Sequence, residues 1–197
     1  MKFFVLNFAA ISGSLVNMEK TLKRLETELS KVRSFGGSPV LQASLSKINN
    51  YGCWCFFQDD HHRAKGPPQN EVDEFCKILH NGYECAIIDS EEKDLSCTPW
   101  KVEYNTSTVI GNTAEEVETN CIDSNSGYCA QRACIVENFF ILNIFSVFFT
   151  STPFDPSLKH ELGIFDYEAQ CLTRSNLQGR GENSNLYIFS HIFPMNC

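Results

Sequence analysis

The chain has 197 residues, 43% of them hydrophobic, and a formal net charge of −8 at pH 7. This length and apolar content predict a globular protein of one domain with a real core. The acidic balance argues against a general attraction to nucleic acid or to anionic membranes, so any contact with lipid is expected to depend on apolar groups.

The start of the chain indicates export. Lys2 precedes the apolar run FFVLNFAAI, and the small residues SGS follow at 12–14, a pattern typical of a signal peptide. We therefore expect residues 1–17 to be a signal peptide and the protein to be secreted, with an uncleaved segment as the alternative. Asn105-Thr106-Ser107 is an acceptor sequence for N-glycosylation that has meaning only in a secreted chain.

An amphipathic helix is predicted next. Apolar side chains recur at steps of four and three in residues 18–33: Met18, Leu22, Leu25, Leu29 and Val32. Two heptads are too few for a stable coiled coil, so packing on the domain is expected, and weak pairing with a second chain is the alternative. Gly36, Gly37 and Pro39 are strong breakers. We therefore expect residues 18–37 to form a helix and linker, followed by the main domain at 38–197.

Local signals divide the first half of the main domain. Residues 40–48 suggest a short helix running into Tyr51, and residues 56–70 show no apolar period and are expected to form a loop. Asn70 with Asp73 resembles a capping box, which predicts a helix of about 19 residues. Residues 97–112 are rich in valine, tyrosine and threonine and predict one or two short strands.

The second half is expected to be helical and then irregular. Thr113 with Glu116 is a second capping box before a helix to about residue 122. Residues 128–149 are the most apolar segment, but their apolar run is too short to span a bilayer. We expect a buried helix there, or one that partly faces an apolar ligand. A divergent extension begins near residue 150, tied down by Cys171 and Cys197.

The cysteine content predicts disulfide bonds. The chain has ten cysteines, an even number that favours a disulfide framework in an oxidising compartment.

His80 is the residue at which catalytic chemistry is expected. Cys76 and His80 share one face of the helix that follows Asn70. A helical histidine acts as a general base when a carboxylate stabilises its imidazolium form, and Glu137 on the apolar helix is the candidate. The alternative is a histidine that merely bonds to the backbone beside a disulfide.

The pattern resembles secreted phospholipase A2. That family joins a calcium loop, YGCYCGxGG, to a helix carrying CCxxHDxCY. This chain has YGCWC at 51–55 and CKILH at 76–80, with Gly66-Pro67 and Asp73 at matching positions. The resemblance covers about residues 40–140. It implies a mainly α, disulfide-stapled fold with two long antiparallel helices and a small β hairpin.

The family's activity is hydrolysis of the sn-2 ester of glycerophospholipids at a membrane or aggregate surface. The resemblance implies that His80 is the general base, with Glu137 as its carboxylate partner. Ca²⁺ is the implied cofactor and would polarise the ester carbonyl. Its ligands map to the carbonyls of Trp54, Phe56 and Gln58 and to the side chain of Asn81.

The chain departs from the family pattern at the metal. Phe56, Phe57 and Gln58 replace loop glycines, and neutral Asn81 replaces a carboxylate, so weaker calcium binding is expected. Glu137 follows Cys134 by three positions, whereas the family's Asp directly follows a cysteine. A lipid- or protein-binding module without turnover is therefore the second hypothesis, and a structural secreted protein is the third.

Several neighbours of the loop have two interpretations each. Asp59 and Asp60 could supply substitute calcium ligands, or they could form a solvated turn. His61 and His62 could bind zinc with Cys53 and Cys55, although cysteines of an even, secreted set are more often oxidised. The apolar side chains at 54, 56 and 57 could form a rim that contacts lipid, or they could be buried in the core.

Overall fold

A computed structural model describes residues 13–32, 45–57, 62–93, 95–107, 113–150 and 154–172. The helices are α1 (Gly13–Val32), α2 (Leu45–Ile48), α3 (Glu71–Glu91), α4 (Ala114–Ser124) and α5 (Tyr128–Thr150). Short helical turns follow as η2 (Pro99–Lys101), η3 (Pro156–Leu158), η4 (His160–Leu162) and η5 (Glu168–Leu172). The expected mainly α class is confirmed.

The expected hairpin does not appear among the described residues, where the β pairs are isolated bridges from Tyr51 to Cys55 and to Lys159. Residues 102–107 have no regular structure, and residues 108–112 lie outside the described part. The backbone of this segment is held by side chains instead of a partner strand: Asn17 donates to the Val102 carbonyl at 3.0 Å, and Arg24 donates to the Thr106 carbonyl at 3.1 Å.

Both predicted capping boxes begin a helix. The side chain of Asn70 accepts the Asp73 N–H at 3.1 Å at the start of α3. The Thr113 hydroxyl accepts the Glu116 N–H at 3.2 Å at the start of α4. Each cap satisfies a backbone donor that has no partner within its own helix, which explains why the sequence locates these two helix starts.

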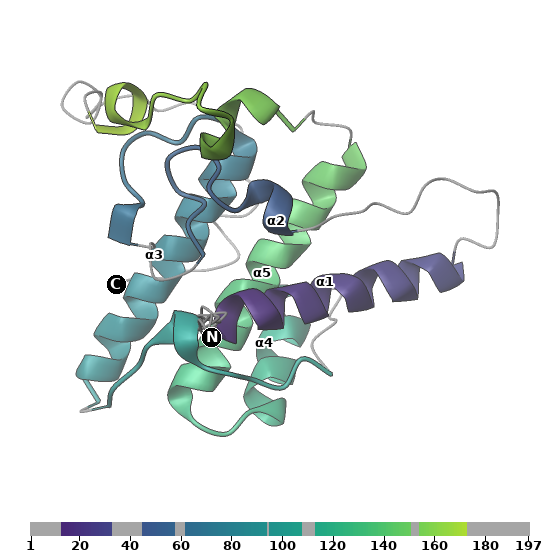
Figure 1. Ribbon diagram of the computed structural model, residues 1–197. Helices are drawn as coiled ribbons and strands as arrows, with labels where there is room; N and C mark the ends of the chain where they lie inside the picture. Colours follow the sequence, from purple (N-terminus) through teal and green to yellow (C-terminus); the bar gives the residue numbers. More distant parts are fainter. Residues whose placement is uncertain are drawn as a thin grey trace, which may run out of the picture.

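Helices α3 and α5 form the centre of the molecule (Figure 1). They are antiparallel, because Tyr83 meets Glu137 whereas the later Asp89 meets the earlier Arg132. Most described side chains of α5 between 130 and 144 are buried, so the buried-helix interpretation holds over that range. In the part of the chain that the structure describes, no helix is long and apolar enough to cross a membrane.

Helix α1 lies across α5 (Figure 1) and packs on the domain as expected. Its stripe residues Met18, Leu22 and Leu25 are buried, while the side chains of Leu29 and Val32 lie outside the described set. The helix begins at Gly13. Cleavage of a signal peptide after residue 17 would therefore fall inside this helix, beside the buried Asn17.

A disulfide framework is confirmed, and none of the cysteines that the structure describes is free. Cys85 is disulfide-bonded, and four further bonds join Cys53 to Cys171, Cys55 to Cys76, Cys97 to Cys129 and Cys121 to Cys134. None of these four joins α3 directly to α5. The Cys97–Cys129 bond instead links the segment that follows α3 to the first turn of α5.

Candidate functional site

The loop that contains YGCWC is attached to the start of α3 by Asp73. The Asp73 side chain is fully buried, and its carboxylate accepts the backbone N–H groups of Cys53 and Trp54, both at 2.8 Å, and of Gln69 at 2.9 Å. Gly52 has φ +58°, and a Cβ atom there would lie 2.4 Å from the Asp73 carboxyl carbon. Only glycine therefore lets the loop approach this carboxylate.

Burial raises the pKa of Asp73 to about 6, although its three backbone hydrogen bonds favour the charged form. Beside this anchor, the Cys55–Cys76 disulfide joins the same loop to α3 covalently. The loop is thus fixed to the helix that carries His80 by one covalent bond and one buried carboxylate.

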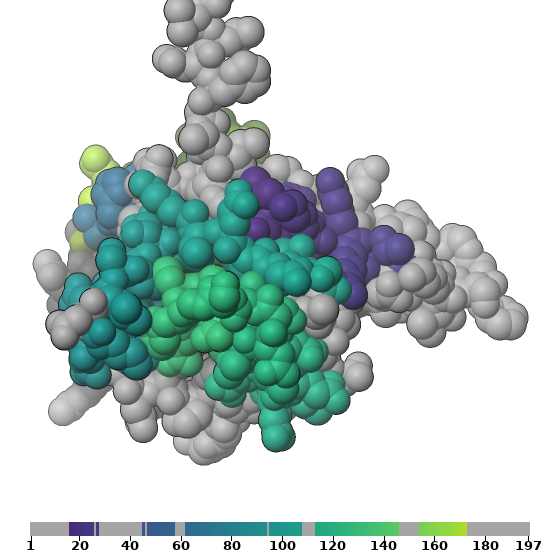
Figure 2. All heavy atoms as spheres, turned by 90° about the horizontal axis from the view of Figure 1, so that it is seen from below, coloured from purple at the N-terminus to yellow at the C-terminus, as the bar shows by residue number. Residues whose placement is uncertain are grey.

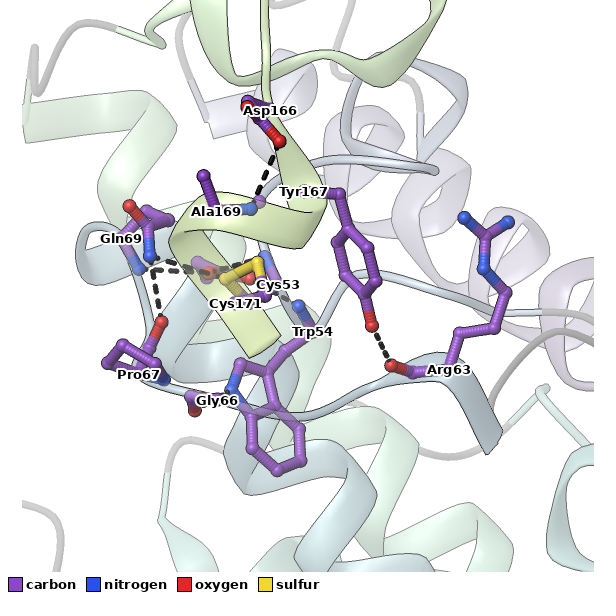
Figure 3. The surroundings of a disulfide bond; sticks show 12 residues. Cys53, Trp54, Arg63, Gly66, Pro67, Gln69, Asp166, Tyr167, Ala169 and Cys171 are labelled. Carbon is purple, nitrogen blue, oxygen red and sulfur yellow. Dashed lines mark hydrogen bonds between the residues drawn. A yellow bond between two sulfur atoms is a disulfide. The ribbon is translucent and has the colours of Figure 1, made fainter. Parts of the chain in front are cut away.

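Gly66 fixes the other side of the loop. Its φ is +93°, and a Cβ atom there would lie 2.1 Å from the Cys171 carbonyl oxygen. The Gly66 carbonyl accepts the indole N–H of Trp54 at 2.9 Å (Figure 3). This close approach explains the glycine of the Gly66-Pro67 motif and orients the Trp54 side chain.

His80 lies on α3 between two aromatic rings. Its side chain is 7% exposed. Its ring centroid is 5.9 Å from that of Trp54 and 6.4 Å from that of Tyr83, with edge-on geometry in both cases. These contacts restrict the orientation of the imidazole and leave it almost no contact with bulk water.

Glu137 is completely buried on α5. The Tyr83 hydroxyl donates to its Oε1 atom at 2.8 Å. Burial and then the Glu137 carboxylate raise the pKa of Tyr104 well above its usual value, so this hydroxyl is a proton donor at neutral pH. The side-chain amide of Asn138 on α5 donates to the Tyr104 hydroxyl at 3.5 Å.

Tyr83 therefore touches both predicted catalytic side chains: its ring faces His80 and its hydroxyl holds Glu137. A buried carboxylate is costly unless it accepts hydrogen bonds, and here the Tyr83 hydroxyl provides one. The arrangement places a proton acceptor and a carboxylate on two rigid, antiparallel helices. Sequence reasoning did not identify Tyr83 or Tyr104, because neither spacing nor residue type relates them to position 137.

The predicted calcium ligands are only partly assembled among the described residues. The Trp54 carbonyl accepts the Phe56 N–H at 2.8 Å, which uses one of its two lone pairs. Asn81 is exposed on α3. Gln58, Asp59 and Asp60 lie outside the described residues. The Lys77 ammonium lies 5.7 Å from the Trp54 ring centroid, so a positive charge is present on the side of α3 where calcium is expected.

Metal binding by acidic or sulfur side chains finds no support in the described ranges, where no group of three or more His, Cys, Asp or Glu residues could hold a metal ion. A zinc site with thiolates is contradicted, because Cys53 and Cys55 are both oxidised; His61 lies outside the described residues. The described part of the loop thus offers calcium two backbone carbonyls, and α3 offers the amide of Asn81. Any carboxylate ligand would have to come from Asp59 and Asp60.

Phe56 and Phe57 are buried in the core and do not form a rim that contacts lipid, because they are only 1% and 3% exposed. The Phe57 ring packs on Phe140 of α5, with centroids 5.5 Å apart. Phe56 packs against the rings of His160 and Tyr167. Trp54 is half-buried, so it is the one member of this trio that retains substantial exposure.

Residues 154–172 cover the outer side of the loop, which the sequence did not predict. The His160 ring bonds to the Gly52 carbonyl at 2.7 Å, and the Cys53–Cys171 disulfide anchors the end of the segment. Figure 3 shows this disulfide with the Tyr167 hydroxyl donating to the Arg63 carbonyl beside it. Desolvation and the nearby Arg63 and Lys159 charges lower the pKa of His160, despite its bond to Gly52.

Comparison of the chain with protein-family models, with curated proteins and with solved structures gives no match in any of the three. The similarity to phospholipase A2 therefore depends on the sequence motifs alone.

Proposed function

We propose that this protein is a phospholipase A2-like hydrolase that cleaves the sn-2 ester of glycerophospholipids. One observation carries the proposal: a fully buried Glu137 carboxylate is held by the Tyr83 hydroxyl, and the same tyrosine packs against His80. A buried carboxylate that shares a tyrosine contact with a buried histidine is a candidate for a functional site.

In this proposal His80 removes a proton from the attacking water. Glu137, oriented by Tyr83, stabilises the imidazolium form of His80 as it develops. Both residues lie on helices that are attached to the rest of the fold by disulfides. The site therefore needs little reorganisation before the reaction.

The proposed calcium ligands are the carbonyls of Trp54, Phe56 and Gln58 with the side chain of Asn81, supplemented by Asp59 and Asp60. Calcium prefers six to eight oxygen ligands. When bound it would supply positive charge for the ester carbonyl oxygen. We expect weak affinity, because Asn81 is neutral and Lys77 lies nearby.

Contact with lipid is proposed through Leu162 and Ile164 instead of the buried phenylalanines. Their side chains are 56% and 67% exposed, the two highest values among the large exposed apolar residues of the described chain. They flank Gly163 at a turn with φ +65°. Secretion is part of the same proposal, and the disulfide-bonded state of nine described cysteines supports it.

A second candidate is a lipid-binding protein of the same scaffold without turnover. It is favoured by the Lys77 ammonium over the Trp54 ring and by the loss of the carboxylate at Asn81. In this case His80 and Glu137 would serve only to fix the helix pair.

Fatty-acid release from phosphatidylcholine vesicles, measured with calcium and with a chelator, distinguishes the two candidates. The hydrolase should release fatty acid only with calcium, and Asn81→Asp should lower the calcium concentration needed by restoring a charged ligand. Binding to vesicles without release in either protein would support the second candidate and contradict the first.

A further inference from the structure

The segment between η2 and α4 carries a feature that the proposed function does not use. Asn105-Thr106-Ser107 is the only Asn-x-Ser/Thr sequence in the chain with a residue other than proline in the middle. Asn105 and Ser107 are both exposed. A bulky glycan on Asn105 would therefore displace no packed side chain.

The side chain of Asn105 forms a compact turn with Ser107. Its Oδ1 atom accepts the Ser107 N–H at 2.9 Å and the Ser107 hydroxyl at 2.6 Å. Such Asx turns are a local property of Asn followed two residues later by Ser or Thr. Both hydrogen bonds use the oxygen, so Nδ2, the atom that carries an N-linked glycan, takes no part in them.

The backbone on either side is fixed to the body of the protein. The Asn105 N–H donates to the side chain of Asn125 at 2.6 Å, and the Thr106 carbonyl accepts from Arg24 of α1 at 3.1 Å. Tyr104, the preceding residue, is buried and lies close to Glu137. The segment is thus held in place by its backbone and by its inward side chains, while the acceptor side chain stays on the surface.

The surrounding surface leaves room for a glycan. Figure 2 shows the segment 95–107, in teal, spread over the face that is turned to the viewer, next to the start of α5. In Figure 1 this segment runs along the lower part of the molecule, whereas residues 154–172 lie at the top. A glycan at position 105 would therefore project from a side of the molecule different from the exposed turn at Leu162 and Ile164.

We propose that Asn105 is an N-glycosylation site. The donor is an oligosaccharide linked through pyrophosphate to a polyprenyl lipid. The Asn105 Nδ2 atom attacks the anomeric carbon, a C–N bond forms, the C–O bond to pyrophosphate breaks, and the transferase base takes the Nδ2 proton. No oxidant or reductant is involved, and the lipid pyrophosphate leaves. This proposal does not depend on the hydrolase activity.

The test is expression of the full chain in secreting animal cells, followed by treatment with a peptide-N-glycosidase. The wild-type protein should show one discrete gain in gel mobility, and peptide mass spectrometry should find aspartate at position 105 after treatment. Asn105→Gln should abolish the shift.

A matched pair of variants tests the role of the Ser107 hydroxyl. Ser107→Ala should lose the glycan, whereas Ser107→Thr should keep it. Thr106→Val, which removes a hydroxyl one position earlier and keeps the carbonyl that Arg24 binds, should also keep it. Recovery of wild-type protein with unmodified Asn105, from the medium or from the cells, would overturn the proposal, as would a shift that persists in Asn105→Gln.

Discussion

Tyr83 is the residue on which the candidate site depends most, because it contacts both His80 and Glu137. Replacement of Tyr83 by Phe keeps the ring and removes the hydroxyl donor. We expect the free energy of unfolding to fall by about 1–3 kcal/mol, the cost of leaving a buried acceptor without its partner. Urea denaturation measures this, and the fall in fatty-acid release should appear in kcat more than in KM.

Tyr128→Phe is the matched control for that variant. The Tyr128 hydroxyl also donates to a carboxylate at 2.8 Å, but its partner Asp89 is 25% exposed and is paired with Arg132. Water can replace the lost donor there, so we expect a change below about 1 kcal/mol. Equal destabilisation by the two variants would contradict the special role assigned to burial at Glu137.

Asp73 predicts a pH dependence of stability. Its pKa in the folded protein is raised from 3.8 to about 6, chiefly by desolvation, so the folded protein holds this proton more tightly than the unfolded chain. The stabilisation of the folded protein by protonated Asp73 is fully present below pH 3.8 and is lost as pH rises through about 6. The difference between the two pKa values corresponds to about 3 kcal/mol.

Asp73→Asn lacks this titration. The free energy of unfolding of the wild type, minus that of the variant, should therefore decrease as pH rises from 3.8 to about 6 and then level off. Denaturation of both proteins over this range gives the measurement. A difference that stays constant with pH, or that increases, would show that the carboxylate is not protonated more readily in the folded state.

The roles of residues that belong to a local sequence motif could be predicted. The roles of residues that depend on contacts between distant segments could not. The glycine in YGCWC and the acidic position 73 were recognised from motifs, and the structure places them in contact. The bond of Tyr83 to Glu137 and the bond of His160 to the Gly52 carbonyl join residues far apart in the chain. No local pattern specifies such pairs.

At the scale of elements, the exposed turn between η4 and Phe165 is expected to lead contact with lipid. Substitution of Leu162 and Ile164 by Asp places two charges where apolar side chains would enter the interface. We expect at least about a tenfold loss of affinity for phosphatidylcholine vesicles, from the lost apolar burial. Co-sedimentation with vesicles measures it, independently of hydrolysis.

Ile122→Asp is the control for the turn, since Ile122 is an exposed apolar residue on α4 with a 45% exposed side chain. Its affinity for vesicles should be unchanged. If the Ile122 variant loses as much binding as the double variant, the contact is not specific to the turn and the assignment is wrong.

The helices were predictable where a cap or a clear apolar period defines them. Asn70 and Thr113 mark the starts of α3 and α4, and the apolar segment at 128–149 coincides with α5. The expected strands at 97–112 are not found in the described part of that segment, where 102–107 is irregular. Val102 and Tyr104 there pack with side chains of α4 and α5, a tertiary role that a composition rich in β-formers does not distinguish.

For the whole molecule, the even cysteine count predicted a stapled fold but not its connectivity, because pairing depends on which segments meet in space. The structure shows two separate consequences of this pairing. The Cys55–Cys76 bond joins the loop to α3, and the Cys53–Cys171 bond draws residues 154–172 over the loop's outer side. Residues 154–172, which contain no recognised motif, thus cover the outer side of the loop.

His80 is the proposed base of an ester hydrolase. The direct test is fatty-acid release by the His80→Gln variant in the presence of calcium. His62→Gln is the matched control, since His62 is an exposed histidine close to the same loop. We expect His80→Gln to lose at least about a hundredfold in kcat, the usual contribution of a general base, while His62→Gln keeps wild-type release and both variants keep wild-type stability. Full release by His80→Gln would contradict the account.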